Sequence, residues 1–187
     1  ISTTSGISAP TGVTAKSTSY QSINISWNKV TGATLYGIYR ATSAEGKYTL
    51  IATTKSSSYN NTKLKTNSTY YYKVRAYNIN GKIVSFSGLT PVVSVKPILA
   101  APISVKAASA SYNSINVSWS RVAGSSLYGI YRATSSAGKY TLVSSTKASY
   151  NSMKIASNNL YYYKVRSYRI IGNVKIFSDL SSVVHAR

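Results

Sequence analysis

The chain has 187 residues and a lopsided charge balance, with 22 Lys and Arg against 2 Asp and Glu and a formal net charge of +20. It contains no Cys and one His, which excludes a disulfide framework and a thiolate metal site. Two acids cannot supply the oxygen ligands of a Ca²⁺ or Mg²⁺ site, and a paired-carboxylate glycosidase site would require Glu45 and Asp179 to meet. Hydrophobic residues make up 43%, so the chain can build a core and is not a disordered basic tail.

The start of the chain carries no structural pattern. It begins at Ile1 rather than Met, and no apolar run is long enough to span a membrane. We expect a piece of a larger protein, with residues 1–8 as the remnant of a linker.

The first strands predicted from the sequence lie at residues 23–27 and 36–38. Apolar and polar residues alternate over Ile23–Trp27 with the period of two that is typical of a half-buried strand, which places Trp27 in the core. Tyr36–Ile38 continues the same alternation after a Thr31-Gly32 turn. The penultimate strand is expected over residues 70–77, before an Asn80-Gly81 turn.

The second half of the chain repeats the first. The segment SINISWNKVTGATLYGIYRATSAEGKYTL at residues 22–50 returns as SINVSWSRVAGSSLYGIYRATSSAGKYTL at residues 114–142. The motif YYYKVR also occurs twice, at residues 70–75 and 161–166. A repeat of this length is a whole domain rather than a solenoid unit.

The repeat predicts two domains, at residues 9–96 and 101–187, joined by a short hinge at 97–100. The joint KPILAAP has Pro at both ends, which favours a semi-rigid connection. Each half of the chain holds eleven cations and one acid, a net charge of +10, so the basic character belongs to the domains themselves. No stretch has a sustained helical period, and short strands separated by turns favour an antiparallel sandwich.

These residues resemble a tandem of fibronectin type III domains of the kind found in secreted and surface multimodular proteins of Gram-positive bacteria. The resemblance implies an all-β fold of two immunoglobulin-like antiparallel sandwiches with about seven strands each. The fold hosts adhesion, ligand binding and plain spacing alike, so it does not select a function. The matching features, given for both copies, are Ala9-Pro10 and Ala101-Pro102, Trp27 and Trp119, YGIYRATS with GKYTL, and Leu64 or Ile155 placed six residues before Tyr70 or Tyr161.

One departure from the bacterial relatives concerns charge. Those relatives carry Asp or Glu in several turns, whereas this chain has Asn, Ser or Lys there, as in YNNTKLKTNS at residues 59–68. Either the lineage has a high isoelectric point, or the cations serve an anionic partner.

Catalysis, a bound metal and a cofactor are not expected. Asp179 and His185 stand six residues apart in the expected last strand, roughly 20 Å along an extended chain, which is too far for a hydrogen bond. Glu45 precedes Gly46 in a turn, and a single His provides no metal site.

The strongest candidate for a site is the outward side of the penultimate strand. If Tyr70 and Tyr72 point into the core, their neighbours point outward on one sheet face, and the neighbouring strand adds Tyr39 to that face. Tyrosine rings alternating with Lys and Arg suit polyanions and sugars, because the rings stack and the cations bind phosphate or sulfate. The candidate ligand-binding residues are Tyr39, Tyr71, Lys73, Arg75 and Tyr77 in the first copy and Tyr131, Tyr162, Lys164, Arg166 and Tyr168 in the second.

The same residues also have a purely structural interpretation, because cross-strand aromatic pairs stabilise an exposed sheet by about 0.2–1 kcal/mol each. The inward tyrosines, 70, 72, 161 and 163, are assigned to the core. Arg40 and Arg132 have inward parity near a strand end and are left out of the face.

Three functions remain open for a secreted or cell-surface protein. The first is a non-catalytic accessory module that binds an anionic cell-surface polymer, such as teichoic acid or an acidic polysaccharide. The second is a structural spacer that holds a catalytic or anchoring domain away from the cell wall, and the third is protein adhesion or assembly. We expect a monomer without a transmembrane segment, and non-specific binding of nucleic acid from charge alone.

Overall fold

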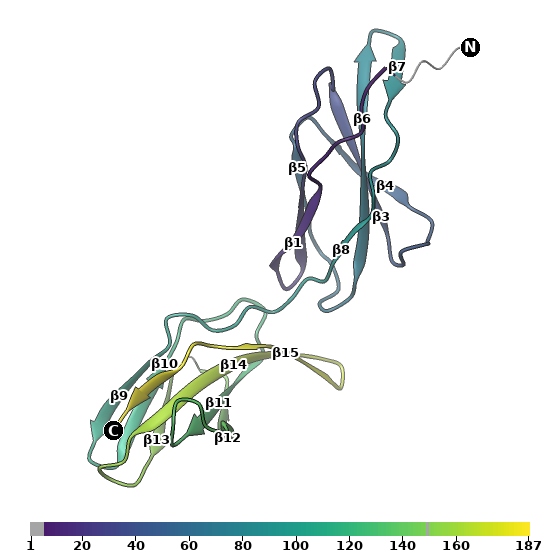
Figure 1. Ribbon diagram of the computed structural model, residues 1–187. Helices are drawn as coiled ribbons and strands as arrows, with labels where there is room; N and C mark the ends of the chain where they lie inside the picture. Colours follow the sequence, from purple (N-terminus) through teal and green to yellow (C-terminus); the bar gives the residue numbers. More distant parts are fainter. Residues whose placement is uncertain (1–5, 149) are drawn as a thin grey trace. The chain divides into compact units, whose positions relative to one another are not determined.

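The computed structural model describes residues 6–148 and 150–187, and it divides into two compact units, Ile1–Ile98 and Leu99–Arg187 (Figure 1). We call these units module 1 and module 2. Every regular element within the described ranges is a β-strand, so no helix there could cross a membrane. The all-β class expected from the sequence is confirmed.

Module 1 is a sandwich of two antiparallel sheets, with β1-β2-β5 in one and β4-β3-β6-β7 in the other, where β8 also pairs with β6. Figure 1 shows the two sheets facing each other, with β1 and β5 on one side and β3, β4 and β6 on the other. The strands are β1 (Thr14–Ser19), β2 (Ser22–Ser26), β3 (Leu35–Ala41), β4 (Thr49–Thr54), β5 (Ser58–Asn61), β6 (Tyr70–Asn80), β7 (Ile83–Phe86) and β8 (Val93–Val95).

Module 2 repeats this topology, with β13-β10-β9 in one sheet and β12-β11-β14-β15 in the other, where β16 pairs with β14. The strands are β9 (Lys106–Ser111), β10 (Ser114–Ser118), β11 (Leu127–Ala133), β12 (Thr141–Thr146), β13 (Tyr150–Lys154), β14 (Tyr161–Ile171), β15 (Val174–Leu180) and β16 (Val184–Ala186).

The alternation in the sequence becomes the core of each sandwich. In module 1, Ile23 and Ile25 of β2 face Tyr72 and Val74 of β6, and all four side chains are fully buried. Successive side chains of a strand point to opposite faces, so residues two apart reach the same core. Ile115, Val117, Tyr163 and Val165 are the fully buried counterparts in module 2.

The tryptophan of each module packs against a tyrosine from the facing sheet. The ring centroids of Trp27 and Tyr36 are 5.3 Å apart with the planes tilted by 58°. The hydroxyl of Tyr36 accepts a hydrogen bond of 2.8 Å from the backbone N–H of Val30, which offsets the cost of burying the phenol oxygen. Trp119 and Tyr128 repeat the contact at 5.2 Å, so the expected core position of both tryptophans is confirmed.

The first tyrosine of the long strand differs from its predicted place. Tyr70 and Tyr161 are half-buried rather than fully buried. Tyr70 packs against the core of module 1, and the guanidinium groups of Arg40 and Arg132 cover the two rings at 5.4 and 4.9 Å. The hydroxyl of Tyr70 accepts a hydrogen bond of 2.9 Å from the backbone N–H of Lys65. This contact is the tyrosine corner that the Leu64–Tyr70 spacing predicted.

The last strand of each sandwich is interrupted, which is why eight strands stand in place of about seven. Between β7 and β8, the hydroxyls of Ser87 and Thr90 accept hydrogen bonds from the backbone N–H groups of Ala76 and Val74, at 3.0 and 2.9 Å. Ser178 and Ser181 do the same for β14 of module 2. Buried side chains thus satisfy strand donors that the interrupted ladder leaves open.

Residues expected to form the linker and the hinge contribute to the modules themselves. Ile7 is buried in the core of module 1. The carbonyl of Pro97 accepts a hydrogen bond of 2.8 Å from the N–H of Asn67 in module 1. The carbonyl of Ala100 accepts a bond of 2.7 Å from the hydroxyl of Ser167 in module 2.

A buried polar network exists in module 1. The amide oxygen of Asn61 accepts hydrogen bonds from the hydroxyl of Tyr72 at 2.9 Å and from Nη1 of Arg40 at 3.0 Å. Burial raises the pKa of Tyr72, so its hydroxyl stays protonated and donates. In module 2 the backbone position across from Ile115 is Met153, so the amide acceptor of module 1 has no counterpart, and Arg132 is the polar group that acts on the hydroxyl of Tyr163.

This difference predicts unequal responses to the same substitution. Tyr72→Phe should lower the free energy of unfolding of module 1 by about 0.5–1.5 kcal/mol, because it removes a satisfied buried hydrogen bond. Tyr163→Phe should cost module 2 less, because Met153 stands at the position where Asn61 supplies the amide acceptor in module 1. Hydrogen exchange of the core amides measures each module separately within the whole chain, and equal losses in both variants would contradict the assignment.

Candidate functional site

The candidate residues lie together on the solvent side of the five-stranded sheet, which we call the outer face. Backbone pairing of β3 with β6 places Tyr39 opposite Lys73, Gly37 opposite Arg75, and Leu35 opposite Tyr77. In module 2, pairing of β11 with β14 places Tyr131 opposite Lys164, Gly129 opposite Arg166, and Leu127 opposite Tyr168. The grouping predicted from strand parity is therefore present in both modules, with Tyr71 and Tyr162 at the same edge of each face.

The cations of the outer face lie over aromatic rings. In module 1, Nζ of Lys73 is 4.6 Å from the ring centre of Tyr48. The guanidinium carbon of Arg75 lies 4.7 Å from the ring centre of Phe86 and 5.9 Å from that of Tyr39. Such contacts are worth about 0.5–1 kcal/mol at exposed sites, so they favour one placement of each of these half-buried cations.

Module 2 repeats the arrangement with small changes. Nζ of Lys164 is 4.5 Å from the ring centre of Tyr140, and the guanidinium of Arg166 is 5.2 Å from that of Phe177. Nε of Arg166 also donates a hydrogen bond of 2.7 Å to the carbonyl of Ser178. In module 1, by contrast, Nε of Arg75 is buried without a hydrogen-bond partner among the described residues.

Four of these aromatic residues were not among the sequence candidates. Tyr48 and Tyr140 belong to the repeated GKYTL segment, and Phe86 and Phe177 pair with Tyr77 and Tyr168 across the hairpin. Their recurrence in both copies was the only available signal, because the sequence alone does not fix which ring meets which cation.

The tyrosines at the end of the face are less accessible than predicted. Tyr168 is only 7% exposed, because it packs against Phe177 with ring centres 5.5 Å apart and lies 5.7 Å beneath Nζ of Lys175. Its predicted outward parity holds, but its ring is covered. In module 1, Tyr77 shares a hydrogen bond with Tyr39, with the hydroxyl oxygens 2.5 Å apart.

Among the candidate residues of the outer face, the charged side chains are Lys and Arg. Loss of hydration raises the pKa of Tyr77, and the hydrogen bond with Tyr39 raises it further. The pKa of Tyr48 is raised by desolvation and then by Glu45, and that of Tyr140 by desolvation and then by Tyr162. The phenols thus stay neutral donors beside Lys and Arg.

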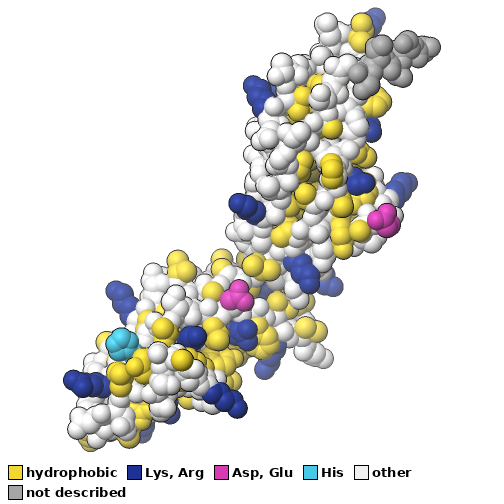
Figure 2. All heavy atoms as spheres, viewed as in Figure 1, with side chains coloured by type: hydrophobic (Ala, Val, Ile, Leu, Met, Phe, Trp, Pro, Cys, Tyr) yellow, Lys and Arg dark blue, Asp and Glu magenta, His cyan; other side chains and the backbone are white. Residues whose placement is uncertain are grey.

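The other cations are spread over turns and strand edges. Figure 2 shows dark-blue side chains standing apart from one another, with hydrophobic side chains between them. The exposed lysines of module 1 are Lys16, Lys29, Lys47, Lys55, Lys63, Lys65, Lys82 and Lys96. The outer face differs from these positions because its cations lie over aromatic rings, and not because it carries more charge.

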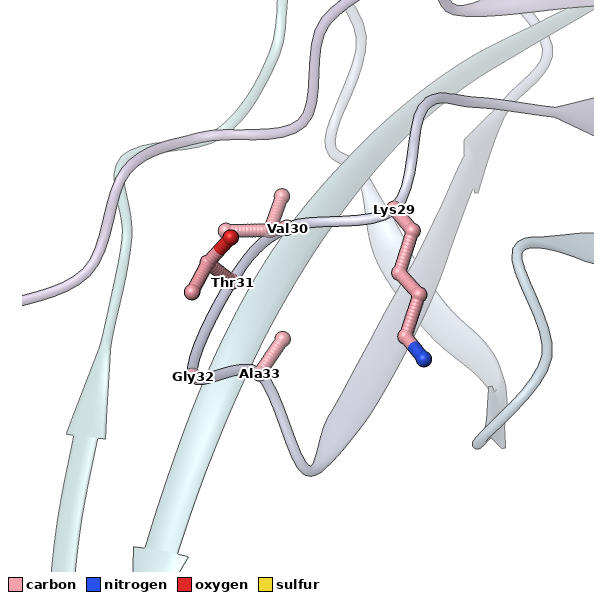
Figure 3. Close-up of a pocket in the computed structure, with 5 residues that line it drawn as sticks. All are labelled: Lys29, Val30, Thr31, Gly32 and Ala33. Atoms are coloured by element: carbon pink, nitrogen blue, oxygen red, sulfur yellow. The ribbon is translucent and has the colours of Figure 1, made fainter.

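The remaining candidates do not form a site. Asp179 lies in β15 and His185 in β16, rather than in one last strand, and both are exposed. His185 contacts the ring of Tyr162 at 5.6 Å. Among the described residues no three potential metal ligands lie together. A depression in the turn before β3 is lined by Lys29, Val30, Thr31, Gly32 and Ala33, and Figure 3 shows a single charged side chain at its edge.

The fold and this face define a tandem of immunoglobulin-like sandwiches that carry a cationic, aromatic sheet surface. Residues 8–91 match the family model of the fibronectin type III domain. Residues 8–91 therefore belong to the fibronectin type III family, and residues 99–187 repeat the same fold.

Comparison with known proteins agrees with this assignment. The chain is similar to Exoglucanase B of Cellulomonas fimi, with 28% identity over 96% of the chain, but it spans only 17% of the length of that enzyme. It also resembles a two-domain fibronectin type III segment of chicken tenascin, with a TM-score of 0.53, 15% identity, and coverage of 96% of this chain and 99% of the other. The second likeness concerns the fold alone.

The outer face predicts a selective sensitivity at glycine. A Cβ added to Gly37 would lie 2.9 Å from Cε2 of Tyr77 and 3.2 Å from Cε2 of Tyr39, so the hydrogen-bonded ring pair would have to move. Gly37→Ala should destabilise module 1 by about 1–3 kcal/mol. Gly88→Ala is the matched control, because nothing lies within 4 Å of its Cβ position. Thermal unfolding followed by circular dichroism measures both, and equal melting temperatures would contradict the predicted packing.

Proposed function

We propose that the chain is a pair of non-catalytic accessory modules from a larger extracellular protein. The modules attach that protein to an anionic cell-surface polymer, such as teichoic acid or an acidic polysaccharide, through their outer faces. Similarity to part of an exoglucanase supports a role beside a carbohydrate-active domain, and the net charge of +20 supports an anionic partner.

The observation that carries this proposal is the pair of ordered cations repeated in both modules. Lys73 and Arg75 are two residues apart on one strand, about 7 Å along the sheet, and both are held over rings. Lys164 and Arg166 repeat the pair. Cations that are already ordered lose less conformational entropy when they bind, so they favour a polymer with regularly spaced anionic groups.

Two such faces on one chain would act together. If both modules reach one polymer, the second contact is intramolecular, and the apparent affinity rises without any new residue. The affinity should fall steeply with salt, because cations that neutralise a polyanion release its counterions.

A spacer is the second candidate, and a different observation favours it. The exposed lysines lie around turns and strand edges rather than on one face, as expected when charge serves solubility alone. In that case the outer-face contacts only stabilise the sheet.

The two functions can be separated by binding to isolated Gram-positive cell walls. The test variant is Lys73→Gln, Arg75→Gln, Lys164→Gln and Arg166→Gln combined, and the matched control is Lys55→Gln, Lys65→Gln, Lys139→Gln and Lys147→Gln. Both remove four positive charges from the net charge of +20, and circular dichroism checks that both are folded.

Outer-face binding predicts that the test variant loses at least about tenfold in affinity for walls at physiological salt and the control much less, because ordered cations contribute more than dispersed ones. Walls stripped of teichoic acid should bind neither protein if that polymer is the ligand. Equal losses in the two variants, or binding only at low salt, would favour the spacer.

A further inference from the structure

The hairpin that ends the long strand exposes aliphatic side chains at its tip. In module 1, β6 and β7 are joined by Gly81 and Lys82, and Ile79, Ile83 and Val84 around them are 43%, 72% and 53% exposed. Figure 1 shows the hairpins of both modules extending past the neighbouring strands. The positive φ of 58° at Gly81 suits the tight two-residue turn that projects these side chains.

These residues depart from the pattern in the rest of the chain. The exposed positions of β1 and β5 are held by polar residues, as at Thr14, Lys16, Ser58 and Asn60. The exposed leucines of β4 and β12, Leu50 and Leu142, each stand singly rather than in a group at a turn. Threonine would also satisfy the β-propensity of the hairpin. Adjacent exposed aliphatic side chains are therefore unnecessary for the fold and typical of an interaction surface.

Module 2 has the same feature. Gly172 and Asn173 join β14 to β15, with φ at Gly172 again 58°. Ile170 and Val174 are 41% and 62% exposed beside the exposed Lys175. The tip thus keeps its aliphatic and basic character although its residues differ between the copies.

Two lysines lie at the same end of the sheet as the tip of module 1, and the one acid of this module lies at the other end. The hydroxyl of Thr34 accepts a hydrogen bond of 3.0 Å from the N–H of Ile79, so the turn that holds Lys29 lies at the same end of the sheet as Lys82. Glu45 lies in the turn that follows β3, at the opposite end, because β3 runs antiparallel to β6.

We propose that the β6–β7 tip, and by repetition the β14–β15 tip, inserts into the surface of an anionic phospholipid bilayer. A convex tip enters the interface without a complementary groove: its aliphatic side chains pass below the headgroups, and its lysines stay at the level of the phosphates. A sugar polymer does not suit this tip, since Ile and Val neither stack on sugar rings nor bond to hydroxyls. The site is separate from the outer-face cations of the proposed function.

Vesicle binding by the full chain tests this inference. Vesicles of phosphatidylglycerol and phosphatidylcholine are compared with pure phosphatidylcholine at physiological salt. The test variant is Ile83→Thr, Val84→Thr, Ile170→Thr and Val174→Thr, which keeps the charge and the β-branched shape. Val92→Thr is the control, because Val92 is 44% exposed in the loop between β7 and β8.

The expected result is binding to the anionic vesicles, lost by about tenfold or more in the test variant and retained in the control. In Ile83→Trp, the new indole should shift its emission to shorter wavelength and be quenched by brominated lipid, whereas the native tryptophans are already buried. Binding that the four Thr substitutions leave unchanged, or an introduced indole that brominated lipid does not quench, would overturn the insertion. Failure of the wild-type chain to bind would overturn it as well. Cell-wall binding by the Thr variant is read separately, so this result does not depend on the outer-face proposal.

Discussion

The two-residue period of the long central strand is the constraint on which both modules depend. β6 and β14 lie in the middle of the five-stranded sheets, so each of their residues must serve either the core or the outer face. Tyr72 and Val74 fill one side, and Lys73 and Arg75 occupy the other. A slip of one residue would exchange the two sets and place cations in the core.

The shortage of acids determines how the outer face is stabilised. With 22 cations and 2 acids, ion pairs can neutralise only a small part of the charge. The outer-face cations instead lie over aromatic rings, and Lys73 on Tyr48 has its counterpart in Lys164 on Tyr140. An aromatic contact orders a cation without cancelling its charge, so a face held in this way stays positive. The same contacts therefore serve stability and suit an anionic partner.

Duplication within one chain separates what the fold requires from what it tolerates. The Trp–Tyr contact, the Ser and Thr hydroxyls at the interrupted strand and the stacked cations recur in both modules. The Asn61 network of module 1 does not, since Met153 stands at the equivalent position of module 2. The fold thus does not require the amide acceptor of Asn61 beneath the long strand.

The sequence by itself determined the tandem β-sandwich, the buried tryptophans, and the grouping of Lys73, Arg75 and their repeats on one face. These follow from a local period and from repetition. Only the tertiary structure decided which rings the cations lie on, that Tyr168 is covered, and that Tyr70 lies beneath Arg40. Those contacts join residues from different strands and turns, and their geometry depends on strand register and side-chain rotamers, which no local pattern encodes.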